Sequence, residues 1–154
     1  MLWQESQKNG LLGKGILIMK VDNCIFCKII NGDIPSRRIY EDDNFVVMMD
    51  VSPASKGHSL LLPKEHYANL FEMPDALLEE LLKVAKKVAA KMKETLNADG
   101  INLLQNNGVA AGQTVFHYHM HLIPRYEGEA PILTWDAKTY SAEEMDEIKS
   151  TILK

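Results

Sequence analysis

The chain has 154 residues, of which 46% are hydrophobic, and this size and composition predict one globular domain with a substantial core. The formal net charge of −4 argues against broad nucleic-acid binding, which usually depends on a basic surface, but it is compatible with a small anionic ligand. No apolar run approaches the roughly 20 residues needed to cross a bilayer, so we expect no membrane partner.

Both cysteines of the chain lie in the stretch CIFC at positions 24 to 27. One closely spaced pair favours a metal site or a redox pair over a disulfide framework and is typical of a reducing compartment, so we expect a cytoplasmic protein. Residues 1–20 show no clear hydrophobic period and are predicted to form a disordered amino-terminal arm, with Met19 as an alternative start. A single domain is therefore expected over 21–154.

The first predicted elements are a helical turn and three strands. The turn covers 24–30 and is ended by Asn31, Gly32 and Pro35. The strand-like runs are separated by acidic or proline-containing turns and cover 38–40, 45–49 and 58–62. Such short connections predict that these strands pair as antiparallel neighbours.

A long helix is predicted next, from Pro74 in its first position to Leu96. Its apolar residues recur every three or four positions, and lysines crowd the opposite side as expected for a solvated face. Further strands are predicted over 101–104 and 116–123. Strands, a helix and more strands in this order predict an α+β fold with a mainly antiparallel five-stranded sheet.

The carboxy-terminal tail is predicted to begin at about residue 128 and to end in a helix. Ser141 is the expected cap of this helix, and Glu144 occupies the capping-box position three residues later.

The stretch FHYHMHLIPR at 116–125 places His117, His119 and His121 at alternate positions. Its residues favour a strand that is ended by Pro124, and the side-chain period of two in a strand puts the three imidazoles on one face. The opposite face carries apolar side chains that can enter a core, namely Tyr118, Met120 and Leu122. The histidines are then expected to face a polar cleft or a metal.

Three imidazoles on one face leave three interpretations open. They can chelate a zinc ion whose bound water hydrolyses a substrate. Alternatively, one neutral imidazole can attack phosphorus, which requires a fixed tautomer and donors for the charge that develops on the phosphate oxygens. The third interpretation is a structural role, which strict alternation disfavours.

The loop QNNGVAAGQTVF at 105–116 leads into the histidines. Gly108 and Gly112 permit close backbone approach, and Asn106, Gln113 and Thr114 add polar side chains. A glycine-containing loop with free N–H groups can cradle phosphate oxygens. Its place immediately before the histidines favours an anion site.

The stretches CIFCKIINGDIPS, YEDDNFVVMMDVSPASKGHSLLLPKEH and GQTVFHYHMHLIPR follow one another over roughly residues 24 to 127 and resemble the histidine-triad (HIT) family, in particular its prokaryotic Hint/Fhit-like members. The resemblance implies a HIT-like fold and a homodimer whose sheet continues across a two-fold axis. It also implies a nucleotide hydrolase or transferase. Such an enzyme would attack the α-phosphate of a purine nucleoside phosphoramidate or a dinucleoside polyphosphate through a nucleotidyl-histidine intermediate.

The same resemblance implies roles for individual residues. His119 would attack phosphorus, and His121 would hydrogen-bond the phosphate or the leaving group. Asp50 would accept the ribose hydroxyls. The catalytic set would be completed by His117, Gln113 and Thr114, of which the last two also contact the phosphate. The remaining nucleotide-binding positions would be Asn106 and Gly112 near the phosphate, and Phe26, Ile29, Met48 and Val51 lining a slot for the base.

For zinc, the resemblance implies a structural site made of Cys24, Cys27, His66 and His117, with no metal required for the chemistry. His66 is preferred to His58, which begins the third predicted strand and matches a position nearer the triad. Two alternatives stay open. One is a zinc hydrolase in which all three triad histidines hold a catalytic metal, and the other is a nucleotide-binding sensor without turnover.

Overall fold

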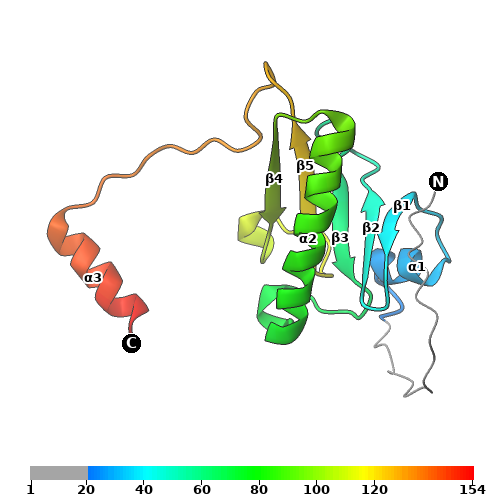
Figure 1. Ribbon diagram of the computed structural model, residues 1–154. Helices are drawn as coiled ribbons and strands as arrows, with labels where there is room; N and C mark the ends of the chain where they lie inside the picture. The colour runs from blue at the N-terminus through cyan, green and yellow to red at the C-terminus, as the bar shows by residue number, and fades with distance from the viewer. Residues whose placement is uncertain (1–20) are drawn as a thin grey trace.

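The computed structural model describes residues 21–154, so the prediction of a disordered arm over 1–20 lies outside the described residues. The fold is α+β, as predicted, and its five-stranded sheet has the order β1-β2-β3-β5-β4 (Figure 1). Every pairing in the sheet is antiparallel. The strands are β1 (Arg38–Glu41), β2 (Phe45–Met49), β3 (Ser59–Pro63), β4 (Gly100–Gln105) and β5 (Met120–Arg125).

Two helices cover opposite faces of the sheet (Figure 1). Helix α1 (Ile25–Asn31) is capped at its amino end by Cys24, whose sulfur accepts the Cys27 N–H. Its carboxy-terminal cap is Gly32, with φ +89°. Glycine suits this left-handed position because it has no Cβ to clash. Helix α2 (Asp75–Leu96) is the long helix predicted from sequence, although Pro74 is its amino-terminal cap and not its first helical residue.

The two central strands β2 and β3 are almost wholly buried because both of their faces are covered. Phe45, Val47 and Leu61 belong to the core beneath α2, together with Leu81 and the rest of the helix's buried stripe. Their neighbours along the strands face α1 instead, in a smaller cluster made of Val46, Met48, Leu60 and Leu62 with Cys24, Phe26 and Cys27. The sheet thus separates a large helix-covered core from the face on which α1 lies.

The histidine-bearing strand differs from its predicted bounds, because β5 begins at Met120 and not at Phe116. Before Met120 the chain is held by other contacts: the Tyr118 N–H donates to the Tyr67 carbonyl at 2.6 Å. The strand also runs through Pro124, which pairs with Ile101 of β4. The Pro124 carbonyl accepts from the Ser55 hydroxyl, on the side where the pairing of β3 with β5 has ended, so the missing N–H interrupts no ladder.

The predicted carboxy-terminal helix is present as α3 (Ala142–Ile152), and both hydrogen bonds of its Ser141–Glu144 capping box are formed. It lies apart from the sheet at the end of an extended segment (Figure 1). Two single-turn helices complete the elements, η1 (Leu70–Glu72) and η2 (Val109–Ala111). None of the helices in residues 21–154 is long and apolar enough to span a membrane.

Candidate active site and metal centre

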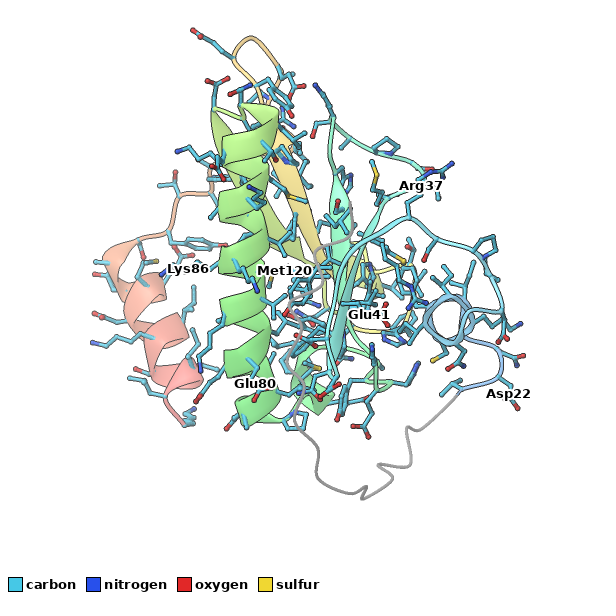
Figure 2. All side chains as sticks on the ribbon, turned by 45° about the vertical axis from the view of Figure 1, so that its right-hand side comes forward. Asp22, Arg37, Glu41, Glu80, Lys86 and Met120 are labelled. Atoms are coloured by element: carbon cyan, nitrogen blue, oxygen red, sulfur yellow. The ribbon has the colours of Figure 1, made fainter. Side chains whose placement is uncertain are left out.

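The histidine segment presents its two kinds of side chain to opposite faces, as the alternation predicted. Tyr118, Met120 and Leu122 lie in the core beneath α2, and Figure 2 labels Met120 beside that helix. On the other face His117 and His119 approach Phe26 of α1, with ring centres 5.9 and 5.1 Å away. This holds although β5 starts only at Met120.

Four side chains from three separate segments form a compact cluster at the start of α1. The Cys24 sulfur lies 3.5 Å from His117 Nδ1, and the Cys27 sulfur lies 3.4 Å from His66 Nδ1 and 3.6 Å from His117 Nδ1. Around a tetrahedral zinc, bond lengths of about 2.3 Å to sulfur and 2.0–2.1 Å to nitrogen put these atoms about 3.6 Å apart. The donor set and its spacing therefore fit a metal ion.

The tautomer of His117 also suits a metal ligand. Its Nε2–H donates to the Pro63 carbonyl at 2.9 Å, which leaves the lone pair on Nδ1 facing the sulfurs. Burial lowers the pKa of the His117 imidazole to about 4, so the ring is neutral at neutral pH. A second hydrogen bond that fixes ring and tautomer is the usual support of a metal-binding histidine.

His119 has the opposite tautomer to His117. Its Nδ1–H donates to the His117 carbonyl at 2.7 Å, so its lone pair is on Nε2. Burial lowers the pKa of this imidazole, which keeps the nucleophilic neutral form. Among the described residues, His119 is not part of any cluster of side chains that can hold a metal ion.

His121 belongs to a third group, with His58 and Asp50. The Ala54 N–H donates to His58 Nδ1 at 3.0 Å, so the proton of His58 is on Nε2, which lies 2.9 Å from His121 Nδ1. His121 therefore accepts at Nδ1 and carries its own proton on Nε2. Burial, with smaller contributions from the neighbouring His119 and His58, lowers the pKa of His121 to about 4.

The alternative in which all three triad histidines hold one catalytic metal does not form in the structure. Across residues 21–154, His117 lies with the cysteine pair, His121 with Asp50 and His58, and His119 with neither. The preference for His66 over His58 in the cysteine cluster agrees with this arrangement. The chain from Ala54 through His58 to His121 was missed by sequence reasoning, which noted only that His58 lies near the triad.

Gln113 is held by backbone groups on both sides of its loop. Its buried carboxamide accepts from the Gly108 N–H at 2.8 Å and donates to the carbonyls of Ala68 and Val115 at 2.6 and 3.0 Å. The side chain therefore braces the loop around η2. Thr114, in contrast, is exposed next to it.

The other expected nucleotide-binding positions lie around the same face. Phe26 and Met48 are buried in one cluster, and Ile29 packs against it. Asp50 is half-buried, with Oδ2 3.5 Å from His58 Nε2, whereas Val51 is 93% exposed. In the loop, Asn106 Nδ2 lies 3.7 Å from where a Cβ at Gly112 would stand, and Gly112 itself has φ +86°.

Comparison with known proteins assigns the chain and its fold to a family. The family model described as the HIT domain matches residues 31–128. The chain is 43% identical over 136 residues to the protein named hit of Bacillus subtilis, covering 86% of this chain and 94% of that protein. A HIT family protein from Bacillus anthracis has a crystal structure that superposes with a TM-score of 0.79 at 43% identity, over 86% of this chain and 96% of the other. The chain belongs to the HIT family.

Two further relatives bear on chemistry and metal. An adenylylsulfatase of Arabidopsis thaliana is 42% identical over 106 residues, which is 69% of this chain and 54% of that protein. The crystal structure of a zinc-bound histidine triad family protein from Mycobacterium smegmatis has a TM-score of 0.68 at 36% identity, with 84% of this chain and 97% of the other covered.

Proposed function

We propose that this protein is a nucleotide hydrolase or transferase in which His119 Nε2 attacks the α-phosphate of a purine nucleotide conjugate. The observation that carries the proposal is the 2.7 Å hydrogen bond from His119 Nδ1–H to the His117 carbonyl. It fixes the lone pair on Nε2, and it stabilises the positive charge that the ring acquires once phosphorus is bound there.

The proposed reaction has two steps. In the first, the bond from Nε2 to phosphorus forms, the bond from phosphorus to the leaving group breaks, and the leaving atom accepts a hydrogen bond from His121 Nε2–H and takes its proton from solvent. His121 stays neutral, because burial lowers its pKa to about 4 and its Nδ1 accepts from His58. In the second step water attacks phosphorus, the bond to His119 breaks, and the proton of the water passes to solvent.

The surroundings support a nucleotide ligand. The half-buried Asp50 can accept the ribose hydroxyls, and Phe26, Ile29 and Met48 supply apolar surface for the base. The exposed Thr114 and the backbone of the Gly108–Gly112 loop offer donors for the phosphate. The leaving group belongs to the classes of amines and nucleoside polyphosphates, to which the adenylylsulfatase relative adds sulfate.

The Cys24, Cys27, His66 and His117 cluster is proposed to bind a structural zinc ion. The donor spacing, the tautomer of His117 and the zinc-bound Mycobacterium smegmatis relative support this. When bound, the ion ties the start of α1 to the histidine segment, whose His117 carbonyl orients His119. The two buried free cysteines also support a reducing, cytoplasmic setting, and the family supports a homodimer.

The direct test is denaturing mass spectrometry after brief mixing with an adenylyl phosphoramidate. We expect a covalent adduct of one AMP that is absent from His119→Ala and present in Glu127→Gln, an exposed control just beyond β5. An adduct that persists in His119→Ala would exclude this nucleophile. Nucleotide binding without adduct or product would favour a sensor instead.

The leaving group is identified by a hydrolysis panel at equal enzyme concentration. The panel contains AMP-lysine, a simple adenosine phosphoramidate, diadenosine polyphosphates and adenylyl sulfate. Because all of them share the adenylyl group, differences in kcat/KM report the leaving-group side alone.

A further inference from the structure

The carboxy-terminal tail exposes an unusual amount of apolar surface. Met145, Ile148 and Ile152 recur at spacings of three and four along α3 and therefore form one stripe, yet no residue of this helix is buried. The extended segment before it exposes Leu133, Trp135 and Tyr140 as well, with Trp135 84% exposed. An apolar helix stripe left exposed in this way favours an interaction site.

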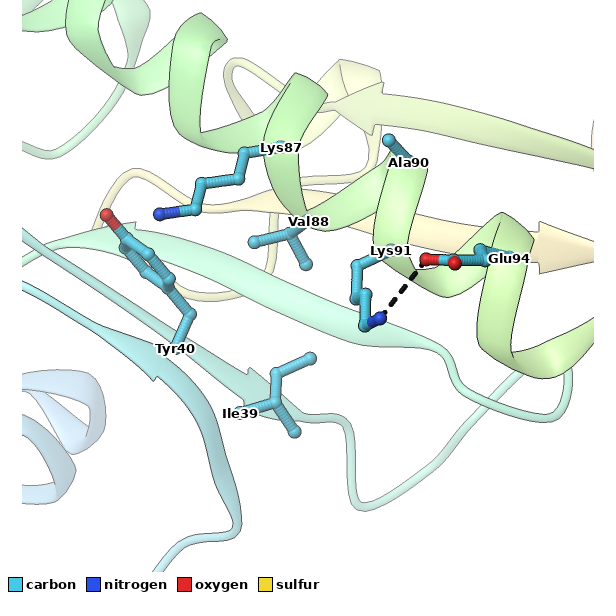
Figure 3. A pocket seen from close by; sticks show the side chains of 7 residues that line it. All are labelled: Ile39, Tyr40, Lys87, Val88, Ala90, Lys91 and Glu94. Carbon is cyan, nitrogen blue, oxygen red and sulfur yellow. Dashed lines mark hydrogen bonds and ion pairs between the residues drawn. The ribbon is translucent and has the colours of Figure 1, made fainter. Parts of the chain in front are cut away.

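A groove of matching character lies between α2 and β1 (Figure 3). It encloses about 330 Å³, and Ile39, Tyr40, Val88 and Ala90 give it an apolar lining. Its rim is charged: the Lys87 ammonium lies 5.3 Å from the centre of the Tyr40 ring, and Lys91 pairs with Glu94 at 3.1 Å.

The charges of the two partners are complementary. Helix α3 carries four acidic residues and one lysine, whereas α2 between residues 83 and 94 carries five lysines and one glutamate. Glu144 and Lys149 flank the apolar stripe of α3 on either side, so the helix can set its stripe in the groove and its charged flanks against the rim.

The positions of the groove and of the tail favour docking of α3 in the groove of a second copy. The groove lies at the β1 end of the sheet, whereas the tail leaves beyond β4 at the other end (Figure 1). Strand β4 has no partner on its outer side among the described residues. If β4 pairs with its copy about a two-fold axis perpendicular to the sheet, both α2 helices lie on the same face, and the second copy occupies the side toward which the tail extends.

We propose that α3 of each copy docks in the α2–β1 groove of a second copy, so that two chains exchange their carboxy-terminal helices. The exchange buries the stripe of Met145, Ile148 and Ile152 against Ile39 and Val88. It is independent of the reaction at His119, so either proposal can fail alone.

The test is disulfide cross-linking between differently tagged full-length chains that are co-expressed, one carrying Ala90→Cys and the other Ile148→Cys. The matched control replaces Ile148→Cys by Ser150→Cys, which lies on the polar side of α3. We expect the first pair to cross-link about tenfold more than the control, because a disulfide forms only between Cα atoms within about 7 Å.

A single chain carrying both Ala90→Cys and Ile148→Cys separates the remaining outcomes. Exchange between copies predicts a covalent dimer on a non-reducing gel. A disulfide within one chain would show that α3 returns to its own groove, and equal cross-linking of the Ile148→Cys and Ser150→Cys pairs would show that α3 docks elsewhere; either result overturns the proposal.

Discussion

The two clusters around His117 and His121 contain similar residue types but are organised in opposite ways. In the first, two sulfurs and two imidazole nitrogens converge within 4.8 Å of one another, which is an arrangement for a cation. In the second, Ala54, His58 and His121 form a chain in which each member donates to the next, which delivers a proton to one end. His119 lies between them and is oriented by a carbonyl of the first. The direction of the hydrogen bonds, more than the residue type, therefore distinguishes the proposed metal site from the proposed catalytic group.

The largest expected effect is that of His119→Ala on turnover. Removing the proposed nucleophile should lower kcat by a factor of about 10⁴ or more, as for other nucleophiles that act in a catalytic unit. Metal content measured by inductively coupled plasma mass spectrometry should stay unchanged, because His119 is no member of the cysteine cluster. Loss of metal in this variant would show that the metal site depends on His119, which would contradict the separation of the two clusters.

Replacing both cysteines, by Cys24→Ser and Cys27→Ser, should remove the metal but leave the proposed nucleophile in place. We expect loss of bound metal and a free energy of unfolding lower by several kcal/mol, because the proposed zinc ion would link α1 to the histidine segment. Urea denaturation with and without a chelator measures this. The chelator should bring the wild type close to the variant and leave the variant itself unchanged.

His58 should act on the reaction through His121. His58→Leu removes the donor to His121 Nδ1 and should lower kcat about tenfold or more with little change in KM, whereas His58→Gln keeps a donor and should retain more of the rate. Metal content is the control, since His58 lies outside the cysteine cluster. Equal losses in the two variants would assign His58 a packing role only.

The smallest expected effect is the pH dependence of stability in the chelator-treated protein. Burial lowers the pKa of His117 and of His121 to about 4, below the value near 6.5 of an unfolded chain. Between these values the unfolded state binds more protons, so the free energy of unfolding should fall as the pH drops from about 6.5 toward 4. Urea titrations at pH 7 and pH 5 check the sign, and His121→Gln should reduce the difference.

Much of the fold followed from local patterns. The stripe of α2, the Ser141–Glu144 box of α3 and the Gly32 stop of α1 were predictable, because caps and periodicity act within a few residues. The start of β5 was not, since a strand exists only where a neighbour pairs with it, and β3 and β4 meet this chain only from Met120 onward. The prediction that Pro124 ends the strand was wrong for the same reason.

The sequence by itself determined which face each triad side chain takes, because alternation is a property of the local chain, and the family resemblance supplied the grouping of His117 with the cysteines. Only the tertiary structure decided how close His117 lies to the cysteine sulfurs, that His58 donates to His121 and that Gln113 braces its own loop. Those assignments depend on which carbonyls and N–H groups the folded backbone brings within hydrogen-bonding distance, and these come from segments up to 93 residues apart.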